Sequence, residues 1–343
     1  MRTKILAMFS VIGLCGAVAL AQGGGGRQGG GRAGGEGGGT TILEQAPTDH
    51  SIAIPNEKLT QYFKDMDAKK LQTLRMVEGG KFNVNIRRIT NAETALVHPI
   101  TIDLWVVLEG SGTFTSGGKV VDGKIVGGTS NPLKVGDVEF IPANLPHGVS
   151  GVNGNITWLN VRWDVDWAPD AELGAGTLPG RGGRGAAAEG RGAAASGGGQ
   201  PGRGGEGRGG GLAPLEYAPA DHAIYIPKEK LDAYRKDMDA KNIGTLRMIE
   251  GGHFNVNIRR IKAPSVEFHP MTIDTWVVLE GSGTANTAFK NEGGKRVEGT
   301  GVTAPAKVGD VFFVPATLTH GLSEVNGAFA WLNIRWDVNW PKK

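Results

Sequence analysis

The chain has 343 residues, enough for two domains of ordinary size, and a formal net charge of +3 at pH 7. Several of the arginines behind this charge stand in glycine runs, as at Arg181 and Arg203. The rest of the chain is therefore close to neutral, without a basic surface that would follow a phosphate backbone. We expect no nucleic-acid partner.

Residues 1–21 have the pattern of a secretory signal peptide. Two basic residues precede the apolar stretch 5–20, and Ala-Leu-Ala at 19–21 is a small-x-small cleavage site before Gln22. The apolar stretch is too short and too interrupted by glycine for a spanning helix, so we expect no stable membrane insertion after the signal is removed. The one cysteine, Cys15, lies inside it. We expect a periplasmic or secreted protein whose mature form has no thiol.

Glycine-rich segments follow the signal at 22–47 and separate two similar regions at 168–212. Such a composition buries too little apolar surface to offset the entropy of the chain, so both segments are predicted to be disordered. They delimit a first domain at 48–167 and a second at 213–343. A tether as long as the second segment spans roughly 40 Å, so the sequence leaves open whether the domains pair with each other.

Each domain is predicted to open with a short extended segment, at 52–54 and 224–226, followed by a proline that suits the first position of a helix. Apolar residues at helical spacing then predict one amphipathic helix, with Leu59, Phe63 and Met66 on its buried side in the first domain. This helix is expected to cover one edge of a core.

The remainder of each domain has the pattern of strands. Phe82, Val84 and Ile86 alternate with polar residues, a period of two that gives one buried face. Further strands are predicted at 104–108, 138–141 and 156–165. Many short strands separated by turn residues indicate a β-sandwich or barrel and not a parallel α/β sheet.

The two domains are copies of one sequence. The run FNVNIRRI at Phe82–Ile89 recurs unchanged at Phe254–Ile261, and six of the 7 histidines and all 8 tryptophans fall at matched positions. A duplication that retains its histidines and aspartates while its loops diverge suggests a site that is present twice. The alternative is that both copies keep the residues that one fold needs.

Two spaced motifs in each copy contain histidine and aspartate, residue types that bind metals or take part in catalysis. In the first copy, His98 precedes Asp103 and a strand that ends in Leu-Glu-Gly, and a Gly-Asp strand start later leads to Pro142 and His147. In the second copy the corresponding residues are His269, Asp274, Pro315 and His320. The pattern resembles the two motifs of the cupin superfamily, which are small β-barrels of the jelly-roll type.

The resemblance covers both copies and leaves out the signal and the linker. It implies an all-β chain of two tandem cupin-type jelly-roll barrels, a bicupin, with a short amphipathic helix before each barrel. Metal-binding cupins use three histidines and one glutamate to hold iron, manganese, zinc or a similar ion. Carried over by position, the resemblance implies metal ligands at His98, Asp103 and His147 in the first copy, and at His269, Asp274 and His320 in the second.

This chain departs from the family pattern at three points. The first histidine position holds Leu96 in one copy and Glu267 in the other, the family's glutamate is an aspartate in both, and the glycine of the second motif is Asn144 or Thr317. Two histidines and one carboxylate still suffice for a metal with open coordination positions. Because Glu267 adds a fourth ligand, we expect firmer binding in the second copy. The alternative is that these groups hydrogen-bond one another in barrels without metal.

Aromatic and basic residues adjoin these motifs. Trp105 and Trp276 lie two residues after the aspartates, so strand alternation turns them to the same face, as pocket walls or as ordinary core residues. Four arginines on strands are able to clamp a carboxylate if they face inward: Arg87, Arg162, Arg259 and Arg335. Alternation alone does not say which face is the pocket. His50 and His222 are interpreted as a surface or capping pair.

Three functions are compatible with these features. The first is an exported bicupin that binds a divalent metal and a small polar molecule, for which the resemblance implies oxygenase, isomerase or decarboxylase chemistry. The second is a non-catalytic binding module that holds a sugar or an organic acid without metal. The third is a structural protein in which the pockets are relics. Metal content separates the first from the other two.

Overall fold

The structure of the chain is a computed structural model that describes residues 40–165 and 214–338. The predicted signal peptide at 1–21, the predicted linker at 168–212 and most of the segment 22–47 lie outside the described residues. In the described part of the chain, neither helix is long and apolar enough to cross a membrane.

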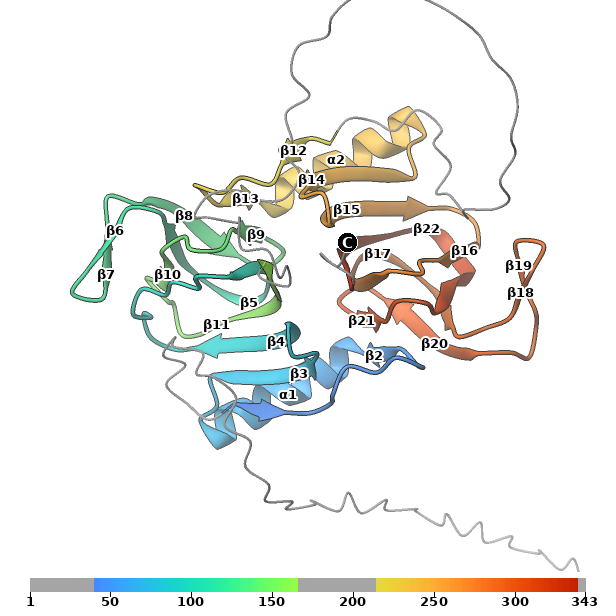
Figure 1. Cartoon of the computed structure of the whole chain (residues 1–343), viewed down its shortest axis with the longest axis horizontal. Helices are drawn as coiled ribbons and strands as arrows, with labels where there is room; N and C mark the ends of the chain where they lie inside the picture. Colours follow the sequence, from blue (N-terminus) through green and yellow to red (C-terminus); the bar gives the residue numbers. More distant parts are fainter. Residues whose placement is uncertain (1–39, 166–213, 339–343) are drawn as a thin grey trace, which may run out of the picture. The chain divides into compact units, whose positions relative to one another are not determined.

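Each copy forms one helix and a set of strands, which confirms the predicted all-β class with a helix before each barrel (Figure 1). The first copy contains β1 (Thr41–Ile42), β2 (Ile52–Ile54), α1 (Asn56–Lys69), β3 (Thr73–Glu78), β4 (Phe82–Ile89), β5 (Thr101–Ser116), β6 (Lys119–Val121), β7 (Lys124–Val126), β8 (Thr129–Lys134), β9 (Val138–Ile141), β10 (His147–Ser150) and β11 (Ile156–Asp164).

The second copy repeats this order. It contains β12 (Glu216–Tyr217), β13 (Ile224–Ile226), α2 (Lys228–Lys241), β14 (Thr245–Glu250), β15 (Phe254–Ile261), β16 (Ser265–Phe268), β17 (Thr272–Thr287), β18 (Asn291–Glu292), β19 (Lys295–Arg296), β20 (Val302–Lys307), β21 (Val311–Val314) and β22 (Thr319–Asp337). In α1, Pro55 precedes the first turn, Leu59 and Met66 are buried two turns apart, and Lys70 ends the helix with φ at 53°. The predicted amphipathic helix is therefore confirmed.

Each copy contributes one strand to the sheet of the other copy. One sheet has the order β1-β3-β4-β11-β5-β9-β13, and the other has the order β12-β14-β15-β22-β17-β21-β2. Strand β13 of the second copy pairs with β9 of the first, and β2 of the first copy pairs with β21 of the second (Figure 1). The extended segments 52–54 and 224–226 are confirmed as strands. Each completes the sheet of the other copy, which answers the question of domain pairing.

The helix after each exchanged strand is also held by the other copy. The backbone N–H of Lys228, the first residue of α2, donates a hydrogen bond to Oδ1 of Asp137 at 2.8 Å. The N–H of Asn56 in α1 donates to Oδ1 of Asp310 at 2.8 Å. Neither helix has a side-chain cap at its own N-cap residue. The Gly-Asp turn of each copy therefore supplies the negative charge and the acceptor that the helix N-terminus of the other copy needs.

Alternate residues of β5 enter two different cores. Leu104 and Val106 pack into a cluster that contains residues of both copies, whereas Trp105 and Val107 pack into a cluster inside the first barrel. Successive side chains of a strand point to opposite faces. Asp103 therefore faces the barrel interior together with Trp105, and Asp274 does the same in the second barrel, where Trp276 belongs to the inner cluster.

The core shared by the copies is rich in aromatic rings. The rings of Trp163 and Trp336 stack with centroids 5.7 Å apart and an angle of 3° between their planes. Both side chains are fully buried. Each also contacts a phenylalanine of the other copy, at Phe254 and Phe82 respectively. Large buried rings contribute strongly to association through their apolar area, so this core joins the two barrels.

The first domain begins earlier than the sequence predicted. Residues 41–42, which the glycine-rich segment 22–47 was expected to include as disordered chain, form β1 and pair in parallel with β3. Gln45 continues this pairing through a bridge to Glu78. Without β1, the outer edge of β3 would offer unpaired backbone groups to an extended segment. The composition of residues 41–42 does not reveal that such an edge is available.

Candidate metal centre

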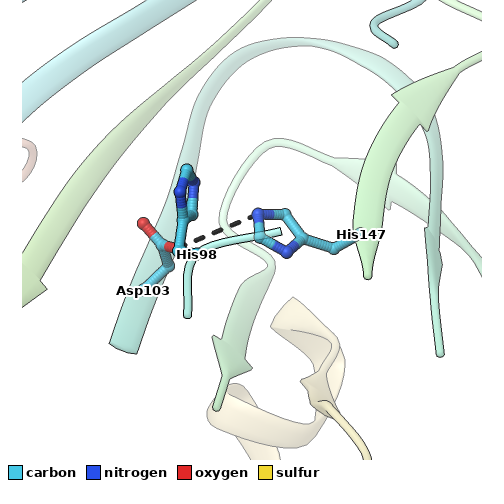
Figure 2. Close-up of side chains that lie close together, drawn as sticks. All are labelled: His98, Asp103 and His147. Atoms are coloured by element: carbon cyan, nitrogen blue, oxygen red, sulfur yellow. Dashed lines mark ion pairs between the residues drawn. The ribbon is translucent and has the colours of Figure 1, made fainter. Parts of the chain in front are cut away.

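His98, Asp103 and His147 lie together inside the first barrel (Figure 2). Asp103 belongs to β5, His147 begins β10, and His98 precedes β5. Oδ2 of Asp103 lies 3.7 Å from Nε2 of His98 and 3.9 Å from Nε2 of His147. One ligand atom from each of the three residues lies within 4.8 Å of the other two. The sequence predicted these three residues, and the fold brings them together.

The second barrel brings together four predicted residues. Ligand atoms of Glu267, His269 and His320 all lie within 4.8 Å of one another. Oδ2 of Asp274 lies 4.0 Å from Nε2 of His269 and 3.7 Å from Nε2 of His320. Two imidazoles and two carboxylates of this kind suit iron, manganese or zinc.

One imidazole in each barrel is oriented by a backbone carbonyl. Nδ1 of His147 lies 2.8 Å from the carbonyl oxygen of Leu145, and Nδ1 of His320 lies 2.8 Å from that of Leu318. A carbonyl oxygen only accepts, so Nδ1 carries a proton, and in the neutral imidazole the lone pair is then on Nε2. Both Nε2 atoms are buried and have no hydrogen-bond partner in the described part of the chain. This is how proteins present histidine to a metal.

The protonation of His320 agrees with this role. Burial lowers the pKa of its imidazole, although the carboxylates of Asp274 and Glu267 act in the opposite direction. The neutral form, which is the form that binds metal, is therefore favoured at neutral pH. The side chains of the second barrel thus present a neutral imidazole beside two carboxylates.

Each aspartate is paired with an arginine of the same barrel. Nε of Arg162 lies 2.8 Å from Oδ1 of Asp103, and Nε of Arg335 lies 2.9 Å from Oδ1 of Asp274. Burial raises the pKa of the Asp103 carboxyl, but Arg162, the two imidazoles and Asn160 together lower it further than burial raises it. Asp103 is therefore a carboxylate at neutral pH. Its Oδ1 is engaged by the arginine and its Oδ2 faces the imidazoles.

A second arginine, which occupies matching positions in the two copies, has a different carboxylate partner in each. Arg259 in β15 places Nη2 2.5 Å from Oε1 of Glu267. The matching Arg87 in β4 places Nη2 2.5 Å from Oε1 of Glu93. Glu267 lies opposite His320 in the strand register, whereas the position opposite His147 is Leu96. The first copy therefore pairs the matching arginine with a carboxylate that lies outside the group of His98, Asp103 and His147, its candidate metal cluster.

Sequence reasoning missed Glu93. The loop between β4 and His98 is one residue longer than its counterpart in the second copy, and that insertion was the available signal. An insertion lets a side chain reach the same arginine from another position in the chain. The first cluster consequently has one carboxylate where the second has two.

Trp105 and Trp276 line their clusters, as alternation predicted. The ring of Trp105 lies edge-on to His147 with centroids 5.7 Å apart, and the ring of Trp276 lies 5.6 Å from that of His320. Both indoles are also buried in the inner apolar clusters. They serve as pocket wall and core at once, so neither interpretation excludes the other.

The remaining paired histidines lie at the surface. His50 is exposed and places Nδ1 2.7 Å from Asp49, and His222 is exposed and places Nδ1 2.8 Å from Asp221. Neither belongs to a metal cluster in the part of the chain that the structure describes. The interpretation of these two as surface residues is confirmed.

Comparison with known proteins gives structural matches alone. No protein-family model matches the chain, and no curated protein matches its sequence. Salicylate 1,2-dioxygenase from Pseudaminobacter salicylatoxidans matches with 15% identity over 84% of this chain and 84% of that chain, at a TM-score of 0.52. A cupin 2 conserved barrel domain protein from Leptotrichia buccalis matches with 10% identity over 77% of this chain and 88% of that chain, at a TM-score of 0.43. At 15% identity the match to the dioxygenase shows the fold alone, and the predicted two-domain cupin fold is confirmed.

Proposed function

We propose that this chain is an exported bicupin that binds a divalent metal in its barrels and uses it to act on a small polar molecule. One observation carries the proposal: in each barrel a buried Nε2, with no hydrogen-bond partner among residues 40–165 and 214–338, lies beside a carboxylate oxygen and a second imidazole. Leaving such a buried group unsatisfied costs about 1–3 kcal/mol. A bound metal would satisfy it.

The residues that would hold the metal are those of the two clusters. They are His98, Asp103 and His147 in the first barrel, and Glu267, His269, Asp274 and His320 in the second. A divalent ion supplies Lewis acidity or activates oxygen. This supports oxygenase, isomerase or decarboxylase chemistry, and oxygenase activity is the first to assay because a solved protein of the same fold is a dioxygenase.

The charges of each cluster favour a small organic acid as the molecule bound. Asp103 is paired with Arg162, and in the second barrel Arg335 and Arg259 each pair with one carboxylate. The carboxylates of both clusters are therefore balanced by arginines before metal binds, and a divalent ion bound to neutral imidazoles adds two positive charges to a buried site. Buried charge is costly unless an opposite charge compensates it, and the carboxylate of a substrate would do so.

Metal analysis of paired variants tests the proposal. His320→Ala is expected to weaken metal binding in the second barrel by more than about 10-fold, because it removes a ligand and not merely an outer partner. His147→Ala should remove less metal per chain, because the first barrel has one carboxylate fewer. The measurement is metal per chain by mass spectrometry after reconstitution with iron, manganese or zinc.

Glu267→Leu provides the matched control. It gives the second barrel the residue that Leu96 provides in the first, so its metal affinity should fall toward that of the first barrel. The two histidine variants leave similar voids, so a shared packing loss cancels between them. A wild-type chain without metal after reconstitution would contradict the proposal, and equal metal loss from both variants would contradict firmer binding in the second barrel.

Export is proposed from the sequence of residues 1–21. Expressed in a bacterium with its own N-terminus, the mature chain is expected to begin at Gln22 and to fractionate outside the cytoplasm. Intact-mass analysis of the exported protein checks this. A mass that includes the whole signal, or a lipid on Cys15, would show that the segment is not cleaved as proposed.

A metal-free binding module is the second candidate. The arginine beside each aspartate favours it, since each carboxylate already has a cationic partner at 2.8 Å or 2.9 Å. Such a module would hold a sugar or an organic acid by hydrogen bonds in the same pockets. A wild-type chain that stays metal-free yet binds an organic acid, with loss of that binding in His320→Ala, would favour this candidate over the first.

A further inference from the structure

A cavity of about 320 Å³ lies in the second copy, next to the hairpin that follows β17. Side chains from β16, β17, β22 and the hairpin that contains β18 and β19 line it, among them Ser265, Val266, Asn286, Phe289 and Arg296. The volume falls in the range of small-molecule pockets.

Part of the cavity lining faces away from the metal cluster. Glu267 and Thr287 are both opposite His320, whereas Val266 and Asn286 are both opposite Gly321. Because successive side chains point to opposite faces of a sheet, Val266 and Asn286 lie on the face away from the cluster. Ser265 and Leu322, which also line the cavity, share the register face of Glu267 and His320. None of the four residues of the second metal cluster lines the cavity, so the cavity is a second site.

Three buried polar atoms without partners belong to residues that line the cavity. Asn286 is 2% exposed, and its Nδ2 donates to the carbonyl oxygen of Thr284 at 2.9 Å. That bond leaves its Oδ1 buried without a donor, and Nε of Arg296 and Oγ of Ser265 are likewise buried without partners in the described part of the chain. Leaving a buried polar atom without a hydrogen-bond partner is unfavourable. Their concentration in the lining of one cavity indicates a polar ligand.

The charges of the lining specify the sign of that ligand. Lys295, Arg296 and Glu298 are its charged residues, an excess of one positive charge. Among the described residues neither Lys295 nor Arg296 forms an ion pair, and Arg296 donates from Nη2 to the carbonyl oxygen of Thr300 at 3.4 Å. A guanidinium whose partner is one distant carbonyl is suited to a carboxylate.

We propose that this cavity binds a small hydroxycarboxylate. The carboxylate lies at the guanidinium of Arg296, a hydroxyl donates to Oδ1 of Asn286, and an apolar part packs against Phe289 and Val266. The first copy lacks the amide: Thr115 is opposite Gly148 where Asn286 is opposite Gly321, and its hydroxyl already bonds to that of Ser130 at 2.8 Å. The site is particular to the second copy.

Titration of the full chain with mandelate tests the proposal. Mandelate carries the carboxylate, the hydroxyl and an apolar ring, and we expect a Kd on the order of 1 mM by calorimetry. Arg296→Gln should weaken binding at least about 10-fold, as expected for loss of about 1.4 kcal/mol or more. Lys290→Gln removes one charge from the same hairpin outside the lining, and should leave the Kd unchanged.

A second comparison isolates the hydroxyl. Phenylacetate lacks it, so wild-type protein should bind phenylacetate more weakly than mandelate, and Asn286→Leu should abolish the difference. No mandelate binding by the wild type at about 10 mM would overturn the proposal. So would binding that survives Arg296→Gln and is lost in His320→Ala, because mandelate would then occupy the metal cluster. That last result would leave the proposed metal function standing.

Discussion

Replacing Glu139 by leucine is expected to stabilise the protein, by about 2 kcal/mol near pH 8. Glu139 belongs to β9, is 0% exposed, and has no hydrogen-bond partner for either carboxylate oxygen among the described residues. Its neighbours across the sheet are Trp105 and Tyr225, so it points into the first barrel. In the second copy the same position is Phe312, opposite Ala53.

The gain should grow with pH. Burial, with the charge of Asp137 adding to it, raises the pKa of Glu139 well above its ordinary value. The folded chain therefore holds a proton that the unfolded chain has released, at every pH between the ordinary and the raised value. Stability falls as pH rises through that window, by up to about 1.4 kcal/mol per pH unit for this group. Glu139→Leu and Glu139→Gln both remove that loss.

Urea unfolding of the wild type and both variants at pH 5 and pH 8 measures the effect. Phe312→Leu is the matched control, because it makes the same kind of change at the same position of the second copy without removing an acid. Its stability change should be the same at both pH values. An equal change for Glu139→Leu at pH 5 and pH 8 would mean that the carboxyl has an ordinary pKa in the folded protein.

If the chain is cut between the barrels, the two fragments are expected to remain associated with each other. A protease site placed within 168–212 allows the cut, and the two fragments should elute together at the volume of the intact chain. The exchanged strands β2 and β13, the helix caps at Asp137 and Asp310, and the stacked Trp163 and Trp336 all cross between copies. Domains joined by the tether alone would separate.

The strength of this association has its own test. Asp137→Ala and Asp310→Ala remove one helix cap each, at a cost of about 1–2 kcal/mol per cap. The cut chain carrying both changes should fall apart at a lower urea concentration than the cut wild type. Separate elution of the two wild-type fragments in buffer without urea would show that the exchange does not hold the barrels together.

The fold and most of the candidate site were predictable from sequence for a physical reason. Period-two alternation marks a strand, and the motif spacing fixes which residues of two strands and a loop meet. The resemblance of the two motifs to those of cupins implied ligands at His98, Asp103 and His147, and the structure places these three residues together. Their counterparts His269, Asp274 and His320 follow from the duplication, whereas Glu267, opposite His320, stands where the first copy has Leu96.

Other features of the fold and the site could not be predicted from the local sequence. Every residue of β11 is buried, so alternation could not distinguish the pocket face from the shared core, and the contact of Arg162 with Asp103 stayed undetermined. The segment Ile52–Ile54 is recognisable as extended, but an extended tripeptide carries no information on which sheet it will join. Its pairing with β21 depends on an edge that another copy of the sequence supplies.

The strand exchange also sets the order in which the chain becomes folded as it is made. The sheet of the first copy is complete once Ile224–Ile226 has been synthesised, after the whole tether and the first residues of the second copy. Until then one edge of β9 is unpaired, and the N-terminus of helix α1 lacks the hydrogen-bond acceptor that Asp310 later provides. If synthesis stops within residues 168–212, the sheet of the first copy lacks β13. The two copies of this duplication therefore reach their native state together.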